Sequence, residues 1–159
     1  MNYELFFVPL HRILYLCEVY FLYTLYIVNK KHMIQDTKVR AAITAIEAYL
    51  PEYILTNEEL SRMVDTSDEW IMTRVGIKER RILKEPVGMS FMAIKAVKTL
   101  LEKNNLQPSD IDGIICSTVT PDMVFPSTAA IISDACGIKN GISFDMQVGC
   151  AGFIHAFKT

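Results

Sequence analysis

The sequence has few of the residues that build metal centres, disulfide frameworks and nucleic-acid-binding surfaces. It holds four cysteines and three histidines in 159 residues, and no two cysteines have the C-x-x-C spacing typical of zinc sites. Sixteen basic residues stand against 18 acidic ones, for a net charge of -2. These shortages argue against a metal site, against a nucleic acid as partner, and for free thiols in a reducing compartment.

Long apolar runs are missing as well. The most apolar stretch, residues 13–28, is 16 residues long and includes Glu18, whereas a membrane-spanning helix needs roughly 18 to 20 apolar residues. Basic residues follow it where a signal peptide would have a small-residue cleavage site. Three interpretations stay open: a weak membrane anchor, a partner-binding amphipathic helix, or upstream sequence read through to an internal start at Met33. We favour the last.

The composition changes near residue 33. Residues 1–32 contain eight of the 16 aromatic residues and none of the seven glycines. The remainder has the ordinary mixture of a globular domain. We therefore expect residues 1–32 to be an extra aromatic-rich segment outside the authentic protein, and residues 33–159 to form one folded part.

Strand and helix patterns alternate from residue 39 onward. Capping-box sequences begin two short helices at Thr56 and Thr66, the second ending near Gly76. A third helix with one apolar stripe is expected over residues 89–103, and a fourth begins at Ser127. Strands are expected at residues 39–48, 77–82, 111–119 and 143–148. This order predicts an α/β fold with a largely buried sheet.

The last expected strand leads into Cys150 and a helical pattern. A thiol at a helix N-terminus faces unpaired N–H groups and the positive end of the helix dipole, which favour the thiolate. Gly149 and Gly152 allow a sharp turn and close approach of a ligand. Although an isolated cysteine is more often a small buried hydrophobe, this setting makes Cys150 the candidate nucleophile.

His155 is not expected to serve as the base for this thiol. It follows Cys150 by five positions, which places it about 140° around a helix axis. We therefore expect His155 to be a helix-packing residue, and no cysteine–histidine dyad within the sequence.

Three separated motifs carry a family resemblance. They are residues 65–80 (DTSDEWIMTRVGIKER), residues 125–127 (FPS) and residues 144–153 (FDMQVGCAGF). In combination and in this order they resemble the amino-terminal half of β-ketoacyl-acyl carrier protein synthase III. The resemblance runs from about Val39 to the end and implies a thiolase-like fold, amino-terminal half only, with a mixed sheet covered by helices. It also implies an incomplete reading frame, since whole enzymes of the family are longer.

The resemblance implies roles for particular residues. Cys150 would attack an acyl-CoA, foremost acetyl-CoA, and form an acyl-enzyme that condenses with malonyl-acyl carrier protein to begin fatty-acid synthesis. Trp70 would stack on the CoA adenine, while Thr66 and Arg74 bind the same nucleotide. Phe125 would reach across a dimer interface into the partner's acyl pocket. Gly149 departs from the family, which more usually has alanine there.

The same resemblance implies a cytoplasmic homodimer that takes acyl-CoA as a substrate and uses no metal and no cofactor. The family's catalytic histidine and asparagine lie in the carboxy-terminal half, so we expect the 159-residue chain alone not to condense. Two alternatives stay open. One is another acyl-CoA condensing enzyme, of the hydroxymethylglutaryl-CoA synthase or polyketide-starter type. The other is a CoA-binding or dimerisation remnant without condensing chemistry. Without the resemblance, Trp70 would be interpreted as a core residue beside a solvated Arg74.

Overall fold

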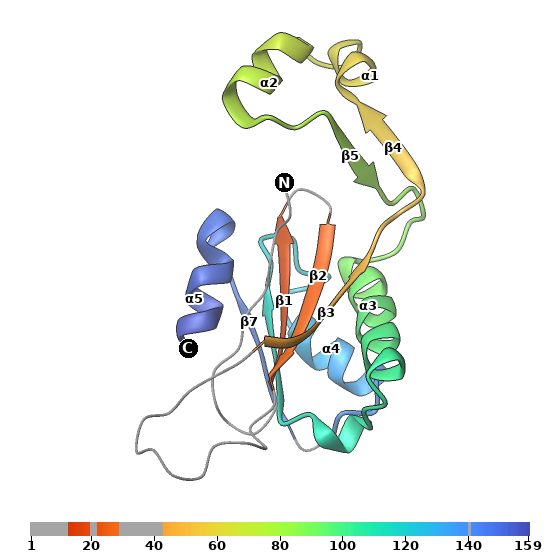
Figure 1. The fold of residues 1–159 in the computed structure, drawn as a ribbon, viewed down its shortest axis with the longest axis vertical. Coiled ribbons are helices and arrows are strands. Elements are labelled where there is room, and N and C mark those ends of the chain that lie inside the picture. Colours follow the sequence, from red (N-terminus) through yellow and green to blue (C-terminus); the bar gives the residue numbers. More distant parts are fainter. Residues whose placement is uncertain (1–12, 20–21, 29–42, 140) are drawn as a thin grey trace.

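The structure is a computed structural model that describes residues 13–19, 22–28, 43–139 and 141–159. Its centre is a five-stranded sheet with the strand order β3-β2-β1-β6-β7. Helices cover both faces of this sheet, and a separate arm projects from one end (Figure 1). The strands of the central sheet are β1 (Ile13–Val19), β2 (Leu22–Val28), β3 (Ile43–Tyr49), β6 (Gly113–Ser117) and β7 (Ile142–Met146).

The central sheet is mixed, as predicted. Strand β2 pairs antiparallel with both β1 and β3, whereas β6 pairs parallel with both β1 and β7. Strands β1 and β3 therefore run in the same direction, since each is antiparallel to the strand between them.

The apolar stretch at residues 13–28 forms β1 and β2, so its interpretation as one amphipathic helix is wrong. β-Branched and aromatic residues are frequent in this stretch, and such residues favour strands over helices. No helix in the described part of the chain is long and apolar enough to cross a membrane.

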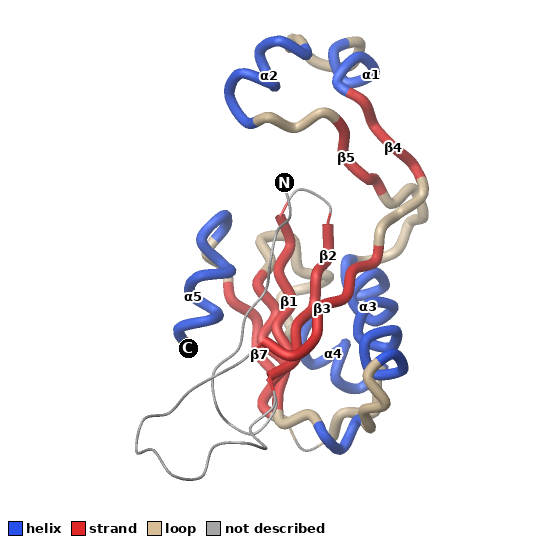
Figure 2. The backbone as a smooth tube through the Cα atoms, viewed as in Figure 1, coloured by secondary structure: helices blue, strands red, loops and turns tan. Residues whose placement is uncertain are grey.

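Three helices pack on the central sheet. Helices α3 (Met89–Lys103) and α4 (Thr128–Ala135) lie on one face, and α5 (Gly152–Lys158) lies on the other (Figure 2). A short 3-10 turn, η1 (Pro108–Asp110), connects α3 to β6. The predicted stripe of α3 is buried throughout, at Met92, Ala93, Ala96, Val97, Leu100 and Leu101.

The core lies between these helices and the sheet. All five residues of β6 are buried, as expected for a strand covered on both faces. Hydrophobic burial at about 25 cal/mol per Å² is the main force that holds such layers together.

The arm is a two-stranded hairpin that carries two short helices. Strand β4 (Tyr53–Thr56) pairs antiparallel with β5 (Glu79–Ile82). Helices α1 (Asn57–Ser61) and α2 (Asp68–Val75) connect them and lie at the far end of the arm from the central sheet (Figure 1). The sequence patterns predicted the helices and β5, but they missed β4.

Capping residues fix the helix ends. The hydroxyls of Thr56 and Ser127 accept hydrogen bonds from the first turns of α1 and α4, as predicted. For α2 the prediction was wrong by one residue, because the cap is Ser67 and not Thr66. Ser67 has an extended backbone and its Oγ accepts from Trp70 N at 3.1 Å. Gly76 ends α2 with a φ of 68°, a conformation that glycine adopts without strain.

Candidate active site

Cys150 lies in a tight turn between the sheet and α5. Strand β7 ends at Met146, and a 3-10 turn, η2 (Gly149–Ala151), follows before α5 begins at Gly152. The thiol is therefore in the turn before the helix rather than in its first residue, a small correction to the prediction. The side chain of Cys150 is exposed, so a substrate can reach it.

Gly149 makes this turn possible. Its φ is +53°, and nothing lies within 4 Å of the position that a Cβ would occupy. The constraint is therefore the left-handed backbone and not a steric contact, and a residue with a Cβ costs about 1 kcal/mol or more in that conformation. The turn exposes Cys150 at the end of β7.

The remaining cysteines of the described residues differ from Cys150. Cys116 and Cys136 are buried. Desolvation raises the pKa of the Cys136 thiol to about 11, although the charge of Lys98 acts in the opposite direction. Both thiols belong to the core, and the raised pKa keeps Cys136 protonated at neutral pH. Cys17 lies in β1, and its side chain is outside the described part.

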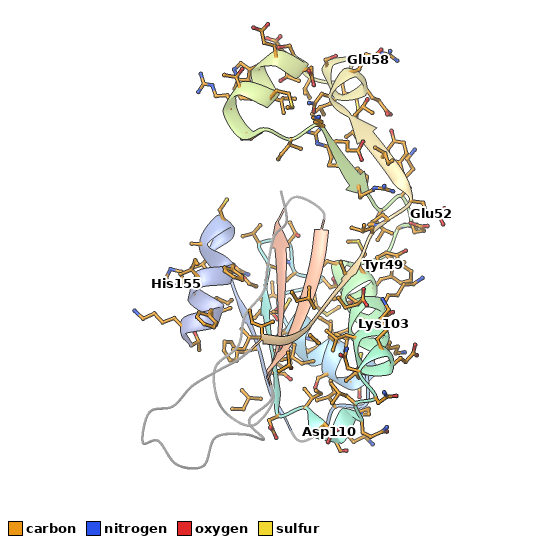
Figure 3. The ribbon with its side chains drawn as sticks, viewed as in Figure 1. Tyr49, Glu52, Glu58, Lys103, Asp110 and His155 are labelled. Atoms are coloured by element: carbon orange, nitrogen blue, oxygen red, sulfur yellow. The ribbon has the colours of Figure 1, made fainter. Side chains whose placement is uncertain are left out.

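His155 is the one histidine among the described residues, and it is exposed on α5. Figure 3 shows its side chain pointing away from the sheet. The prediction that it packs within the fold is wrong, because Gly152 and Ala156 form the buried side of this short helix. That His155 does not serve as the base for Cys150 stays a prediction. His11 and His32 lie outside the described residues.

Asp145 connects the strand of the nucleophile to α4. Its Oδ2 accepts from Thr128 N at 2.7 Å and its Oδ1 accepts from Ala129 N at 2.8 Å. A carboxylate at a helix N-terminus also interacts favourably with the helix dipole. The strand that leads to Cys150 therefore fixes the start of α4. Sequence patterns gave Asp145 no role, because the one charge in the strand expected at residues 143–148 marks the residue but not its partners on α4.

Phe125 lies just before α4, in a loop of exposed apolar side chains. The exposed loop consists of residues 119–125, with Phe125 87% exposed and Val124 99% exposed. A cis peptide bond joins Phe125 to Pro126. The helix that follows this loop, α4, is hydrogen-bonded to Asp145 of β7, the strand that leads to Cys150.

A second carboxylate fixes the middle of the exposed loop. Asp122 Oδ1 accepts from Ser90 N at 3.0 Å, and Asp122 Oδ2 accepts from Ser90 Oγ at 2.5 Å. A Cβ on Gly88 would lie 2.3 Å from Asp122 Cγ, so this close approach requires glycine. The exposed loop is thus held at Asp122 by the start of α3, and Asp145 holds the start of the helix that follows the loop.

Trp70 and Arg74 lie together on α2 in the arm. The Arg74 Cζ is 5.4 Å from the centroid of the Trp70 ring, within the range of a cation–π interaction. Trp70 is 55% exposed, which rules out its interpretation as a core residue. Thr66 is half-buried immediately before the Ser67 cap. The structure thus groups these three candidate nucleotide-binding residues on the arm, whereas Cys150 and Phe125 belong to the sheet layer.

No group of three or more metal-ligating side chains occurs among the described residues.

Comparison with known proteins identifies relatives of the chain. It is 55% identical over 123 residues to a protein from Phocaeicola vulgatus named β-ketoacyl-[acyl-carrier-protein] synthase III, a match that covers 77% of this chain and 37% of the relative. A synthase III from Caldanaerobacter subterraneus is 55% identical over 118 residues, 74% of this chain and 36% of the relative. The chain thus spans about 37% of the length of the Phocaeicola relative. No protein-family model matches it.

Solved structures agree with these relatives. The 3-oxoacyl-[acyl-carrier-protein] synthase III of Aquifex aeolicus superposes with a TM-score of 0.64 and 47% identity, covering 70% of this chain and 36% of that one. A priming β-ketosynthase from the R1128 polyketide pathway superposes with a TM-score of 0.62 and 34% identity, covering 69% of this chain and 33% of that one. In sequence and in fold, the chain therefore corresponds to the amino-terminal part of a β-ketoacyl-[acyl-carrier-protein] synthase III, a condensing enzyme with the thiolase-like fold.

Proposed function

We propose that this chain supplies the nucleophile and the nucleotide-binding face of an enzyme that begins fatty-acid synthesis. The observation that carries the proposal is the exposed Cys150 at the end of β7, in a turn shaped by Gly149. Because the chain spans 37% of a synthase III relative, the complete reaction is proposed for a protein of the relatives' length.

The first step is transfer of an acyl group to Cys150. The thiolate attacks the carbonyl carbon of acetyl-CoA, a carbon–sulfur bond forms, and the bond to CoA breaks. CoA leaves as a thiolate and takes up a proton from solvent. Acyl-CoA is in this account a substrate and not a resident cofactor.

The second step is condensation. Malonyl-acyl carrier protein loses carbon dioxide, and the carbanion that results attacks the thioester carbonyl. A carbon–carbon bond forms and the Cys150 sulfur leaves. Stabilising the developing enolate requires hydrogen-bond donors, and removal of a single such donor commonly costs ~10²- to 10³-fold in rate. His155 is exposed and points away from the sheet, so we assign the stabilisation of the enolate to groups outside the described residues.

The arm is the proposed site for the CoA nucleotide. Trp70 presents a half-exposed ring for adenine, and Arg74 supplies a cation beside it for phosphate. Thr66 adds a hydroxyl at the start of the same helix. The adjacency of an exposed aromatic ring and a guanidinium supports this assignment.

The exposed loop is the proposed contact with a second copy of the chain. Monomeric surfaces seldom keep a contiguous group of large apolar side chains in water, and four residues of this loop, Val119, Met123, Val124 and Phe125, are exposed. In the proposed homodimer, Phe125 enters the acyl pocket of the partner. Free thiols at Cys136 and Cys150 suit a reducing compartment such as the cytoplasm.

The reaction is tested by completing the chain. Residues 1–159 are joined to the carboxy-terminal remainder of the Phocaeicola relative, and the purified protein is incubated with acetyl-CoA and malonyl-acyl carrier protein. We expect acetoacetyl product, none with Cys150→Ala, and undiminished product with the matched core variant Cys136→Ser. A folded protein whose product formation is independent of Cys150 contradicts the proposal.

The polyketide-starter alternative has one observation in its favour, the 34% identity to the R1128 priming enzyme. The same assay distinguishes it when longer and branched acyl-CoAs are supplied beside acetyl-CoA, because a preference for one of those over acetyl-CoA would favour a starter enzyme. A hydroxymethylglutaryl-CoA synthase would instead use acetoacetyl-CoA as the acceptor. A remnant would bind CoA without forming product.

A further inference from the structure

The arm contains one buried side-chain amide whose donors and acceptor all form hydrogen bonds. Asn57, the first residue of α1, is 2% exposed. Its Nδ2 donates to Asp68 Oδ1 at 2.8 Å and to the Ile77 carbonyl oxygen at 2.8 Å. Its Oδ1 accepts from Arg80 Nη1 at 2.8 Å. Both donor hydrogens and the acceptor oxygen thus have partners, which fixes the orientation of the amide.

These hydrogen bonds connect both ends of α2 to the rest of the arm. Asp68 is the first residue of α2, Ile77 follows its Gly76 cap, and Arg80 lies in β5. Asn57 itself begins α1. One side chain therefore sets the position of α2, and with it the position of Trp70 and Arg74.

Few apolar side chains are buried in the arm, so hydrophobic packing does little to fix the position of α2. Within residues 53–82, the buried apolar side chains are those of Leu55 and Ile71. Two such side chains leave the packing of two short helices weakly determined, since burial is roughly proportional to apolar area. A buried polar network with all its partners satisfied specifies a unique arrangement.

We propose that Asn57 is a positioning residue that holds the Trp70–Arg74 face of α2 in the arrangement that receives a CoA nucleotide. The inference rests on the proposed function of that face. Asn57 does not touch the nucleotide; it raises the fraction of molecules in which ring and guanidinium are ready to bind, and the apparent affinity scales with that fraction.

Asparagine is required rather than a residue of similar shape. Aspartate at this position keeps the bond from Arg80 but loses both donors, and it places a carboxylate against Asp68 and the Ile77 carbonyl. A protonated carboxyl group can donate one hydrogen bond, so acidification restores part of the network in the Asn57→Asp variant. This recovery with falling pH separates positioning through hydrogen bonds from a general loss of packing.

The experiment uses the fact that Trp70 is the one tryptophan in the sequence. Its fluorescence anisotropy reports the mobility of α2 without ligand, and its quenching by added coenzyme A reports binding. Asn57→Ala and Asn57→Asp are compared with Glu58→Ala. Glu58 is the next residue on α1 and forms an exposed ion pair with Arg62 (labelled in Figure 3), so its removal leaves the Asn57 bonds intact. Far-UV circular dichroism confirms that each variant is folded.

We expect the Asn57 variants to lower the Trp70 anisotropy and to weaken coenzyme A binding about tenfold, from the cost of buried groups left without partners. Glu58→Ala should match the unchanged protein in anisotropy and in affinity for coenzyme A. The affinity of Asn57→Asp, divided by that of the unchanged protein at the same pH, should rise on acidification. Equal affinity and equal anisotropy of Asn57→Ala and the unchanged protein overturn the inference.

Failure of the proposed function is distinguishable from failure of this inference. If the unchanged protein shows no saturable quenching by coenzyme A, the nucleotide site is wrong. The ligand-free anisotropy then decides the positioning role: a decrease in Asn57→Ala but not in Glu58→Ala supports it, and no decrease contradicts it.

Discussion

At the scale of single residues, exposure determines which thiol reacts. Cys150 is exposed, whereas Cys116 and Cys136 are buried, and desolvation raises the pKa of Cys136 to about 11. In a Cys17→Ser background, we expect iodoacetamide at neutral pH to label Cys150 and no other cysteine of the folded protein. Cys136 should remain a thiol until the pH approaches 11 or the protein unfolds. Peptide mapping by mass spectrometry after timed labelling measures the order.

The control for this labelling is the same reaction in urea, where all remaining thiols should react at similar rates. Labelling of Cys136 before Cys150 under folding conditions would show that the turn at η2 is not open to solvent. Such a result would remove the basis for Cys150 as the nucleophile.

At the scale of elements, Asp145 is expected to hold α4 against β7. Asp145→Ala leaves Thr128 N and Ala129 N without their acceptors, and loss of such a cap costs about 2 kcal/mol of unfolding free energy. Asp145→Asn keeps one acceptor oxygen and should cost about 1 kcal/mol. Urea unfolding followed by circular dichroism measures both. Asp134→Asn, at the exposed far end of α4, should change stability by less than about 0.5 kcal/mol; an equal loss there would contradict the capping role.

A second connection between elements depends on pH. Glu47 of β3 accepts a hydrogen bond from Lys103 Nζ of α3 at 2.5 Å (Lys103 labelled in Figure 3). Desolvation raises the pKa of Glu47, but the hydrogen bonds from Lys103 and from Ala48 N outweigh it, and the pKa lies below its ordinary value of 4.5. Because the folded-state pKa is lowered, the ionised pair stabilises the fold above 4.5, and the contribution is lost as the pH falls through the folded-state value.

We therefore expect Glu47→Gln to lower the unfolding free energy by about 0.5 kcal/mol at neutral pH, since Lys103 is 64% exposed and solvent screens the pair. The difference from the unchanged protein should close on acidification, because protonated glutamate resembles glutamine. Urea titrations across that pH range measure it. A difference that is constant with pH would assign the effect to packing instead.

The elements also show how far the sequence could predict the structure. Helix α3 was predicted to its exact bounds because its apolar stripe repeats over 15 residues. Strand β4 has only 4 residues and passes directly into α1, so period-two alternation had no length in which to appear. The predicted cap of α2 was wrong by one residue because Thr66 and Ser67 both have a hydroxyl that can cap a helix, and the backbone decides between them.

Some features of the candidate site could likewise be predicted from the sequence, and others could not. The closeness of Trp70 and Arg74 follows from their spacing on one helix, and the turn at Cys150 follows from local glycines. The roles of Asn57 and Asp145 depend on partners that lie 11 to 23 residues and 16 to 17 residues away in the sequence. Local patterns carry no information about such partners, so those residues emerged from the structure.

At the scale of the whole molecule, we propose that residues 1–32 are an addition to the family fold, as their composition indicates. The match to the Phocaeicola relative covers 77% of the chain. In the structure, β1 and β2 lie between β3 and β6. Removing both leaves β3 parallel to β6, because β3 runs in the direction of β1. Strand β3 has 7 residues, as many as β1, so it can take the place of β1 beside β6.

We expect a protein of residues 33–159 to unfold cooperatively and to keep the reactivity of Cys150. Direct pairing of β3 with β6 should then appear as slow amide hydrogen exchange in both strands. Loss of cooperative unfolding on this deletion would contradict the proposal and assign β1 and β2 an essential place in the sheet.

Intact-mass measurement of the purified chain with acetyl-CoA tests whether Cys150 accepts the acyl group of an acyl-CoA. We predict a mass increase of one acetyl group, located on the peptide that contains Cys150, with release of an equal amount of free CoA thiol. The adduct should be reversed by hydroxylamine and absent in Cys150→Ala. Trp70→Ala should slow its formation about tenfold, from the stacking energy of a base on an aromatic ring. Absence of an adduct in a folded protein that binds coenzyme A, or an adduct that persists in Cys150→Ala, would contradict the account.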